Sequence, residues 1–197
     1  MRRVSVVGGS CTGKTTTSRE LARRLGVPHV ELDALHHEPG WQEAPADVLQ
    51  ARLEAALAAA PDGWVVDGNY QGKLGMFVVE RADTVVFLDL PHRVALRRAL
   101  WRTASRIVSR KQLWNVNRET LQNVLSRHSI VWWVITHHRS YRARLPERLA
   151  ALTHVDVVRL RSPREVRAWL QSIQATESMS GSSKASERQK TPPLAET

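Results

Sequence analysis

The sequence predicts an α/β fold in which a five-stranded parallel sheet lies between two layers of helices. Three observations support this prediction. Short apolar runs alternate with helical stretches, which is typical of βαβ units. The strongest run, Thr84–Leu90, holds no charge before Asp89, as expected for a strand covered on both faces. The chain has 197 residues, of which 42% are hydrophobic, enough for one domain with a substantial core.

The predicted elements can be placed in order along the chain. Strands are expected at Arg3–Val7, His29–Leu32, Trp64–Val66, Thr84–Leu90 and Val155–Leu160. Helices are expected at 13–25, before Gly26-Val27-Pro28, and at 46–60, between Pro45 and Pro61. A long helix opens at Pro91, and a second helical face runs from Leu121 to Ile135. Ser162 is a candidate N-cap for a last helix at Pro163–Ile173.

The composition indicates how the chain is organised. We expect residues 1–174 to form one domain. Residues 175–197 are rich in Ser, Thr, Lys, Glu and Pro and are expected to be a disordered tail. A single cysteine excludes an internal disulfide framework. The longest strongly apolar run, Ile130–Ile135, is too short to span a bilayer. We therefore expect a cytoplasmic protein without a membrane partner.

The positive charge is concentrated in one segment. The chain has a net charge of +10, and residues 91–148 hold twelve arginines and one lysine against two glutamates. Arg98, Arg102, Arg106 and Arg110 recur every four residues, so they form one stripe if the helix continues that far. Like charges at this spacing destabilise a helix unless an anion lies along them. The stripe is either a helical, Arg-rich lid that clamps a polyphosphate or a solvated helix face.

A complete phosphate-binding motif lies near the N-terminus. Residues 8–15 match G-x-x-x-x-G-K-S/T, with a predicted strand before them and a predicted helix after them. Such a loop wraps a polyphosphate with backbone N–H groups at a helix N-terminus. Lys14 is expected to reach the outer phosphates, and the Thr15 hydroxyl to bind Mg²⁺. The predicted fold is therefore a three-layer P-loop NTPase fold. The expected nucleotide-binding residues in this region are Gly8, Gly9, Ser10, Cys11, Thr12, Gly13, Lys14, Thr15 and Thr16.

Three acidic residues end predicted strands, where parallel sheets place their ligands. Asp67 follows Val65-Val66, as a Walker B carboxylate does, and is expected to hold the Mg²⁺ site together with Thr15. Asp33 is a candidate to orient an acceptor hydroxyl or phosphate. Each could instead cap the turn that follows its strand, and this is the favoured interpretation of Asp89.

These features together resemble P-loop kinases of the adenylate-kinase-like group. The N-terminal P-loop, Asp67-Gly68, the run Phe87-Leu88-Asp89-Leu90-Pro91 and the Arg-rich segment carry the resemblance, which covers residues 1–173. Three further segments resemble bacterial adenylate-kinase-related proteins labelled "DNA topology modulation". These segments are Leu32–Trp41, Trp64–Tyr70 and Asn117-Arg118-Glu119.

The resemblance implies roles for particular residues. It implies ATP with Mg²⁺ as the donor, an acceptor-binding segment at about 34–62 and a lid at about 98–148. Arg98 and Arg102 match lid arginines, Arg118 or Arg142 is the candidate opposing arginine, and Arg161 marks the adenine-binding turn. Two arginines that grip the acceptor's phosphate in adenylate kinases are replaced here, one by His36 and one within Asn69-Tyr70-Gln71. The implied acceptor-binding residues are Asp33, His36, Trp41, Gly68 and Tyr70.

The sequence therefore predicts an ATP-dependent phosphotransferase acting on a nucleotide or other small molecule, with Lys14, Asp33, Arg98, Arg102 and Arg118 as its catalytic residues. The alternative is a nucleic-acid-associated ATPase that uses the basic helical segment, although no known nucleic-acid-binding motif supports it. A GTPase switch is disfavoured because no Asn-Lys-x-Asp motif is present. The pairs His36-His37 and His137-His138 lack the spacing of zinc-binding helices, and we interpret them as surface or acceptor-pocket histidines.

Overall fold

The computed structural model describes residues 1–109 and 130–173. Its five strands form one parallel sheet in the order β2-β3-β1-β4-β5. The strands are β1 (Arg3–Gly8), β2 (His29–Glu31), β3 (Trp64–Asp67), β4 (Thr84–Leu88) and β5 (Asp156–Leu160). The predicted number of strands and their parallel arrangement are confirmed. β1 lies at the centre of the sheet because both β3 and β4 pair with it.

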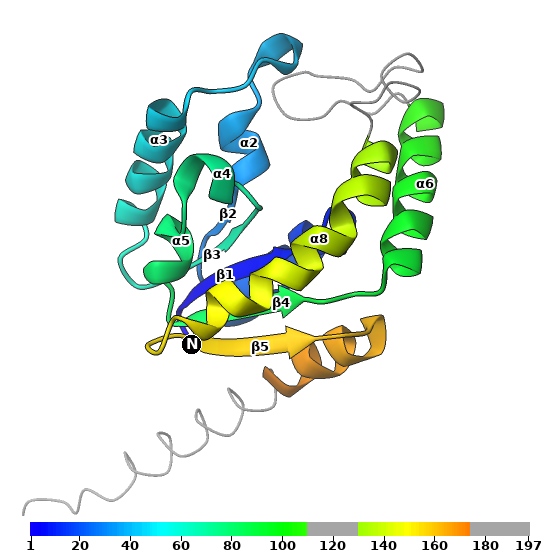
Figure 1. Ribbon diagram of the computed structural model, residues 1–197. Helices are drawn as coiled ribbons and strands as arrows, with labels where there is room; N and C mark the ends of the chain where they lie inside the picture. The colour runs from blue at the N-terminus through cyan, green and yellow to red at the C-terminus, as the bar shows by residue number, and fades with distance from the viewer. Residues whose placement is uncertain (110–129, 174–197) are drawn as a thin grey trace, which may run out of the picture.

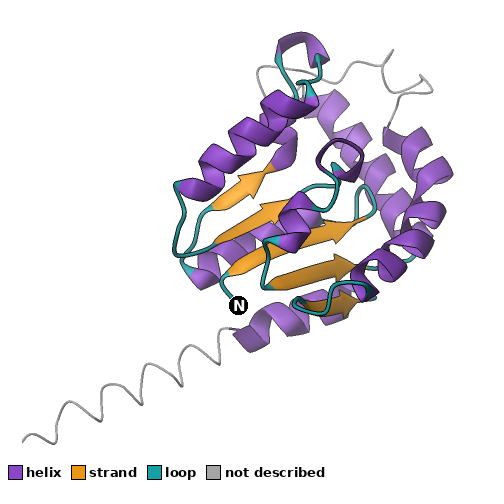
Figure 2. Cartoon of the chain, turned by 60° about the vertical axis from the view of Figure 1, so that its left-hand side comes forward, coloured by secondary structure: helices purple, strands orange, loops and turns teal. Residues whose placement is uncertain are grey.

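The helices lie on both faces of the sheet (Figure 1). They are α1 (Lys14–Leu25), α2 (Leu32–His36), α3 (Ala46–Ala58), α4 (Gln71–Leu74), α5 (Phe77–Glu80), α6 (His92–Ser109) and α8 (Ile130–Ala150). A short 3-10 turn, η1, covers Pro39–Trp41. A last helix spans residues 163–173, as predicted. Figure 2 shows the same sheet from another side, with helices above and below it.

Alternation along the central strand divides the core into two layers. Val4 and Val6 of β1 pack with Leu21 of α1 and with Trp169 of the last helix. Val7, on the opposite face of β1, packs with residues of α3 and with Leu145 of α8. Successive strand side chains point to opposite faces, so the apolar runs of the sequence supply both layers. The predicted three-layer α/β architecture is confirmed.

Several predicted boundaries are corrected by one or more residues. Leu32 begins α2 instead of ending β2, so Asp33 lies in the first turn of a helix and not at the end of a strand. β3 extends to Asp67, β4 ends at Leu88, α3 ends at Ala58 and β5 begins at Asp156. The short helices α2, α4 and α5 were not predicted, because four or five residues are too few to show helical periodicity.

The two helices of the basic segment lie side by side (Figure 1). Ala95 and Ala99 of α6 pack against Val134 of α8. Small side chains at this contact let the two helices approach closely. The rest of the expected lid, including Arg110 and Arg118, lies outside the described residues, as does the predicted tail at 175–197. No helix in the described ranges is long and apolar enough to cross a membrane.

Candidate nucleotide and acceptor site

The phosphate-binding motif forms the turn between β1 and α1, with Gly8 the last residue of the strand and Lys14 the first of the helix. Gly13 has φ 96° and ψ 23°, a left-handed conformation that glycine adopts without strain. The Thr12 hydroxyl donates a hydrogen bond of 2.8 Å to the carbonyl of Gly9 and closes the loop on itself. The motif is thus folded at a helix N-terminus, where an anion is favoured.

The Lys14 ammonium lies over this loop. Its Nζ donates to the carbonyl oxygens of Gly8 and Gly9, at 3.1 Å each. Burial lowers the pKa of Lys14, while the negative charges of Asp33 and Asp67 act to raise it. Lys14 therefore lies against the loop and within electrostatic reach of two acidic residues.

Thr15 and Asp67 meet directly beside the loop. The Thr15 hydroxyl donates to Oδ2 of Asp67 at 2.7 Å and lies 3.4 Å from Oε1 of Glu31. Glu31 and Asp67 are register partners on adjacent strands, so their backbones hold the two carboxylates near each other. His29 Nε2 is 2.9 Å from Oδ1 of Asp67. Hydroxyl and carboxylate oxygens are the donors that Mg²⁺ prefers, so these residues fit that ion.

α6 brings two of the predicted arginines to the loop. Arg98 Nη1 donates to the Thr12 carbonyl at 2.6 Å. Arg102 lies one turn further along, is partly buried, and its Nε has no hydrogen-bond partner within the described part of the chain. The positive charge of Arg102 contributes to lowering the pKa of Lys14. Both side chains therefore lie on the loop side of α6. By contrast, Arg93 and Arg97 of the same helix are exposed.

α8 also contacts the loop, through His138, which the sequence indicated as a surface or acceptor-pocket side chain and which the structure buries against Gly9. The ring of His138 is 4% exposed, and its Nε2 lies 3.0 Å from the Leu90 carbonyl. The ring packs so closely on Gly9 that a Cβ on that residue would lie 2.4 Å from Nδ1. Burial lowers the pKa of His138. The neutral ring must then carry its proton on Nε2, because the Leu90 carbonyl can only accept a hydrogen bond.

Asn69 provides a second connection between α8 and the loop. Its side-chain amide donates to the Gly8 carbonyl, and its Oδ1 accepts a hydrogen bond of 2.9 Å from the Tyr141 hydroxyl of α8. Asn69 follows β3 within the segment that differs from adenylate kinases. This one side chain thus joins β1, the loop after β3 and α8.

Asp89 is held by two arginines from distant parts of the chain. Its carboxylate is buried and bonds Arg142 of α8 and Arg159 of β5, with a distance of 2.9 Å to Arg159 Nε. Arg142, one of the two candidates for the opposing lid arginine, is therefore engaged in an ion pair. The other candidate, Arg118, lies outside the described residues. The sequence favoured Asp89 as a cap of the following turn. In the structure its carboxylate instead joins α8 to β5.

The predicted acceptor-binding residues are linked to one another by contacts among α2, η1 and the loop after β3. The Tyr70 hydroxyl donates to Oδ1 of Asp33 at 2.7 Å. The Tyr70 ring lies 4.5 Å from His36, and the Trp41 ring lies 5.5 Å from His37, centroid to centroid. Gly68 packs against Leu32 of α2.

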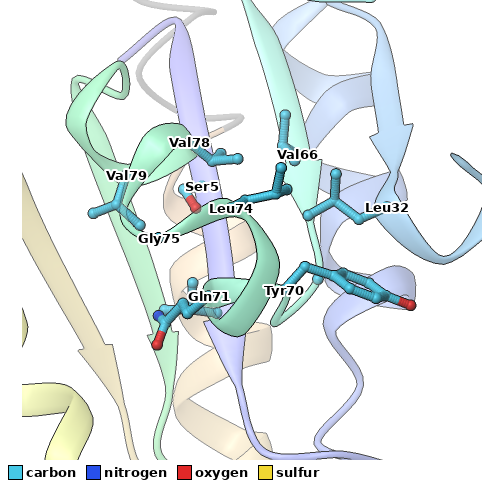
Figure 3. A pocket seen from close by; sticks show the side chains of 11 residues that line it. Ser5, Leu32, Val66, Tyr70, Gln71, Leu74, Gly75, Val78 and Val79 are labelled. Carbon is cyan, nitrogen blue, oxygen red and sulfur yellow. The ribbon is translucent and has the colours of Figure 1, made fainter. Parts of the chain in front are cut away.

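A small, mainly apolar cavity adjoins this group (Figure 3). Tyr70 and Leu32 lie at one end of it, and Val66, Leu74 and Val78 line its interior.

The remaining predicted positions differ in how closely they approach the loop. Thr16 is exposed on α1, and Ser10 and Cys11 are partly buried within the loop. Arg161 lies in the turn after β5, where its backbone N–H donates to Glu165. Its side chain is exposed, and the described contacts include none between it and the loop. No group of three or more His, Cys, Asp or Glu residues suited to a metal is found within residues 1–109 and 130–173.

Comparison with known proteins supports the fold. The chain resembles the structure of a shikimate kinase from Bacteroides thetaiotaomicron, with a TM-score of 0.50 and 16% sequence identity. The match covers 90% of this chain and 98% of that one. At such low identity the likeness establishes the fold, which is the P-loop α/β fold that the sequence predicted. No protein-family model and no curated protein matches the chain, so the narrower resemblance to "DNA topology modulation" proteins is not confirmed.

Proposed function

We propose that the protein is an ATP-dependent phosphotransferase that moves the γ-phosphoryl group of Mg-ATP to a nucleotide or other small molecule. The observation that carries the proposal is the 2.7 Å hydrogen bond between Thr15 and Asp67 at the start of α1. It supports the proposal because a hydroxyl and a carboxylate, the oxygen donors that Mg²⁺ prefers, meet beside the P-loop. The fold shared with a solved kinase supports the same class of activity.

Catalysis in this class is mostly positioning and neutralisation of phosphate charge. Lys14, Arg98 and Arg102 supply three cationic side chains around the loop. Thr15 and Asp67 would hold Mg²⁺, which neutralises phosphate charge when bound. Arg161, in the turn after β5, is proposed to lie beside the adenine base. In support, β4 pairs in parallel with both β1 and β5, so the turn that holds Arg161 lies at the same edge of the sheet as the P-loop.

Removing the Lys14 ammonium tests this function. We expect Lys14→Ala to lower ATP turnover about a hundredfold or more, because a preorganised cation at the phosphates is removed. Arg23→Ala is the matched control, since it removes an exposed cation from the same helix. Turnover is measured as labelled phosphate transfer, and folding by circular dichroism. Undiminished turnover of folded Lys14→Ala would contradict the proposal.

Mg²⁺ dependence provides an independent test of Thr15. We expect Thr15→Ala to raise the Mg²⁺ concentration needed for half-maximal turnover, while Thr15→Ser keeps it near the wild-type value. The serine variant retains the hydroxyl that donates to Asp67. Equal Mg²⁺ dependence of all three proteins would exclude a role for the hydroxyl.

A further inference from the structure

The acceptor side of the site is acidic, although the whole chain is strongly basic. Residues 25–51 include no Lys or Arg and five acidic residues, within a chain of net charge +10. These residues form β2, α2, η1 and the start of α3. Three basic side chains from outside this segment pair with its acids in the described part of the chain. They are Arg52 with Glu38 at 2.7 Å, Lys73 with Glu43 at 2.9 Å and Arg19 with Glu31 at 4.0 Å.

Asp33 is the acidic residue of this segment that both bonds Tyr70 and acts on the P-loop lysine, Lys14. Its Oδ1 accepts the Tyr70 hydroxyl at 2.7 Å. Its negative charge is the largest of the influences that raise the pKa of Lys14, so it lies within electrostatic reach of the place where phosphates would bind. Because Tyr70 occupies Oδ1, Oδ2 is the oxygen left to accept a hydrogen bond from an incoming hydroxyl.

The groups that contact Asp33 and Tyr70 are polar and aromatic. The cations that act on Asp33 and His36, Lys14 and Lys73, already bond the P-loop carbonyls and Glu43. His36 is 2% exposed, and its Nδ1 has no partner among the described residues. Burial lowers the pKa of His36 and raises that of Tyr70, so both rings stay neutral near pH 7. The rings of His37 and Trp41 complete the group. Hydroxyls and ring faces suit such surroundings, whereas a phosphate or carboxylate would meet the like charge of Asp33.

We propose that the phosphoryl acceptor is an alcohol that bears no phosphate or carboxylate, and that Asp33 takes the proton of its attacking hydroxyl. In this step a bond forms between the hydroxyl oxygen and the γ-phosphorus. The bond from that phosphorus to the bridging oxygen breaks, ADP leaves, and the proton moves to Asp33. Tyr70 is the positioning residue that orients the carboxylate. This inference rests on the proposed function, and it narrows the class of acceptor.

Matched pairs of acceptors test the inference. Labelled ATP is offered to the full-length protein with adenosine or AMP, cytidine or CMP, ribose or ribose 5-phosphate, and glucose or gluconate. Glucosamine is added as a cationic alcohol. We expect transfer to at least one uncharged or cationic alcohol, at a kcat/KM at least tenfold above that of its anionic partner. Transfer only to the anionic members, or to none of the panel, overturns the inference.

Variants of Asp33 separate this inference from the proposed function. We expect Asp33→Asn to lower kcat for the alcohol at least a hundredfold, with the Kd for ATP changed less than threefold by calorimetry. Tyr70→Phe lowers kcat by a smaller factor and leaves the KM for the alcohol and the Kd for ATP within threefold of the wild type, a split between kcat and binding that a purely structural residue would not give. Asp47→Asn, at an exposed position in α3, is the control. Undiminished turnover in Asp33→Asn overturns the inference alone. Absence of ATP binding in the wild-type protein overturns the proposed function itself.

Discussion

The contact between Gly9 and His138 shows how one residue can fix the choice of another far away in the sequence. His138 fills the space that a side chain at position 9 would need, since a Cβ there would lie 2.4 Å from Nδ1. The pattern G-x-x-x-x-G-K-S/T allows any residue at position 9. In this chain the His138 ring of α8 leaves room only for glycine there.

Substitution of Gly9 is therefore expected to be costly. We predict that Gly9→Ala lowers the free energy of unfolding by about 1–3 kcal/mol, as overpacking does. His138→Ala in the same chain should restore most of this stability, because the ring that clashes is gone. Chemical denaturation of the wild type, both single variants and the double variant measures the coupling. If the two effects simply add, the contact does not constrain the loop.

The buried carboxylate of Asp89 predicts a dependence of stability on pH. Burial alone would raise its pKa, but hydrogen bonds and charges from Arg142 and Arg159 outweigh burial and lower it. The folded state therefore binds the proton less tightly than the unfolded state. The stabilisation is complete above the unfolded pKa of about 3.9 and is lost as the pH falls through the lower folded value.

We predict that Asp89→Asn lowers the free energy of unfolding at pH 7 by about 1–3 kcal/mol. We also predict that this variant loses less stability than the wild type between pH 5 and pH 2. Urea denaturation at several pH values measures both effects. Asp156→Asn, which removes an exposed acid from the neighbouring strand, is the control. Parallel curves for Asp89→Asn and the wild type would show that Asp89 does not carry the acid sensitivity.

Residues differ in how far the sequence alone could place them. Lys14, Thr15 and Asp67 could be predicted to meet, because a contiguous motif and a strand-ending acid bring them to one edge of the sheet. Asn69, His138 and Tyr141 could not, because their partners in or beside the loop are distant in sequence and no spacing signals the contact. Glu31 could have been found, since it is an acidic residue near the end of a predicted strand, two residues before Asp33.

At the scale of elements, the sequence predicted the long helices α1, α3 and α6 and missed the short ones. Glycine and proline boundaries indicated α1 and α3, and apolar spacing indicated α6. The predicted face that ends at Ile135 overlaps only the start of α8, and α2 and α4 have only five and four residues. A segment of that length is held by its tertiary contacts more than by its own propensity. Because α2 is too short to show helical periodicity, the sequence predicted Asp33 at the end of a strand. In the structure the α2 backbone places it within reach of Tyr70.

The last helix has a capping arrangement that the sequence indicated. The Glu165 backbone N–H donates to the Ser162 hydroxyl at 3.2 Å, and the Glu165 carboxylate accepts hydrogen bonds from the Ser162 hydroxyl and the Arg161 backbone N–H. We predict that Ser162→Ala lowers the free energy of unfolding by about 1 kcal/mol, which corresponds to about 2–4 °C in melting temperature for a chain of this size. Ser162→Asp should restore most of it. An unchanged melting temperature in Ser162→Ala would show that the cap is dispensable.

At the scale of the whole molecule, charge is divided between two sides of the site. The acidic segment at residues 25–51 forms the proposed acceptor side, and the basic segment begins with α6 on the proposed donor side. α6 itself has two faces. Arg98 contacts the P-loop at the Thr12 carbonyl, while Arg93 and Arg97 are exposed to solvent. The two faces allow a nucleotide lid to be distinguished from a nucleic-acid-binding surface.

If α6 serves as a lid, Arg98→Ala and Arg102→Ala should each lower ATP turnover at least tenfold, while Arg97→Ala leaves turnover unchanged, because only the first two face the loop. Duplex DNA should neither compete with ATP nor stimulate its use. If the segment instead binds nucleic acid, Arg93→Ala and Arg97→Ala should weaken DNA binding and reduce the slope of its salt dependence by about one unit for each phosphate that the variant no longer neutralises. Turnover without DNA would then be insensitive to all four changes. We expect the first pattern, because the hydrogen bond from Arg98 to Thr12 ties α6 to the loop on which the phosphates would lie.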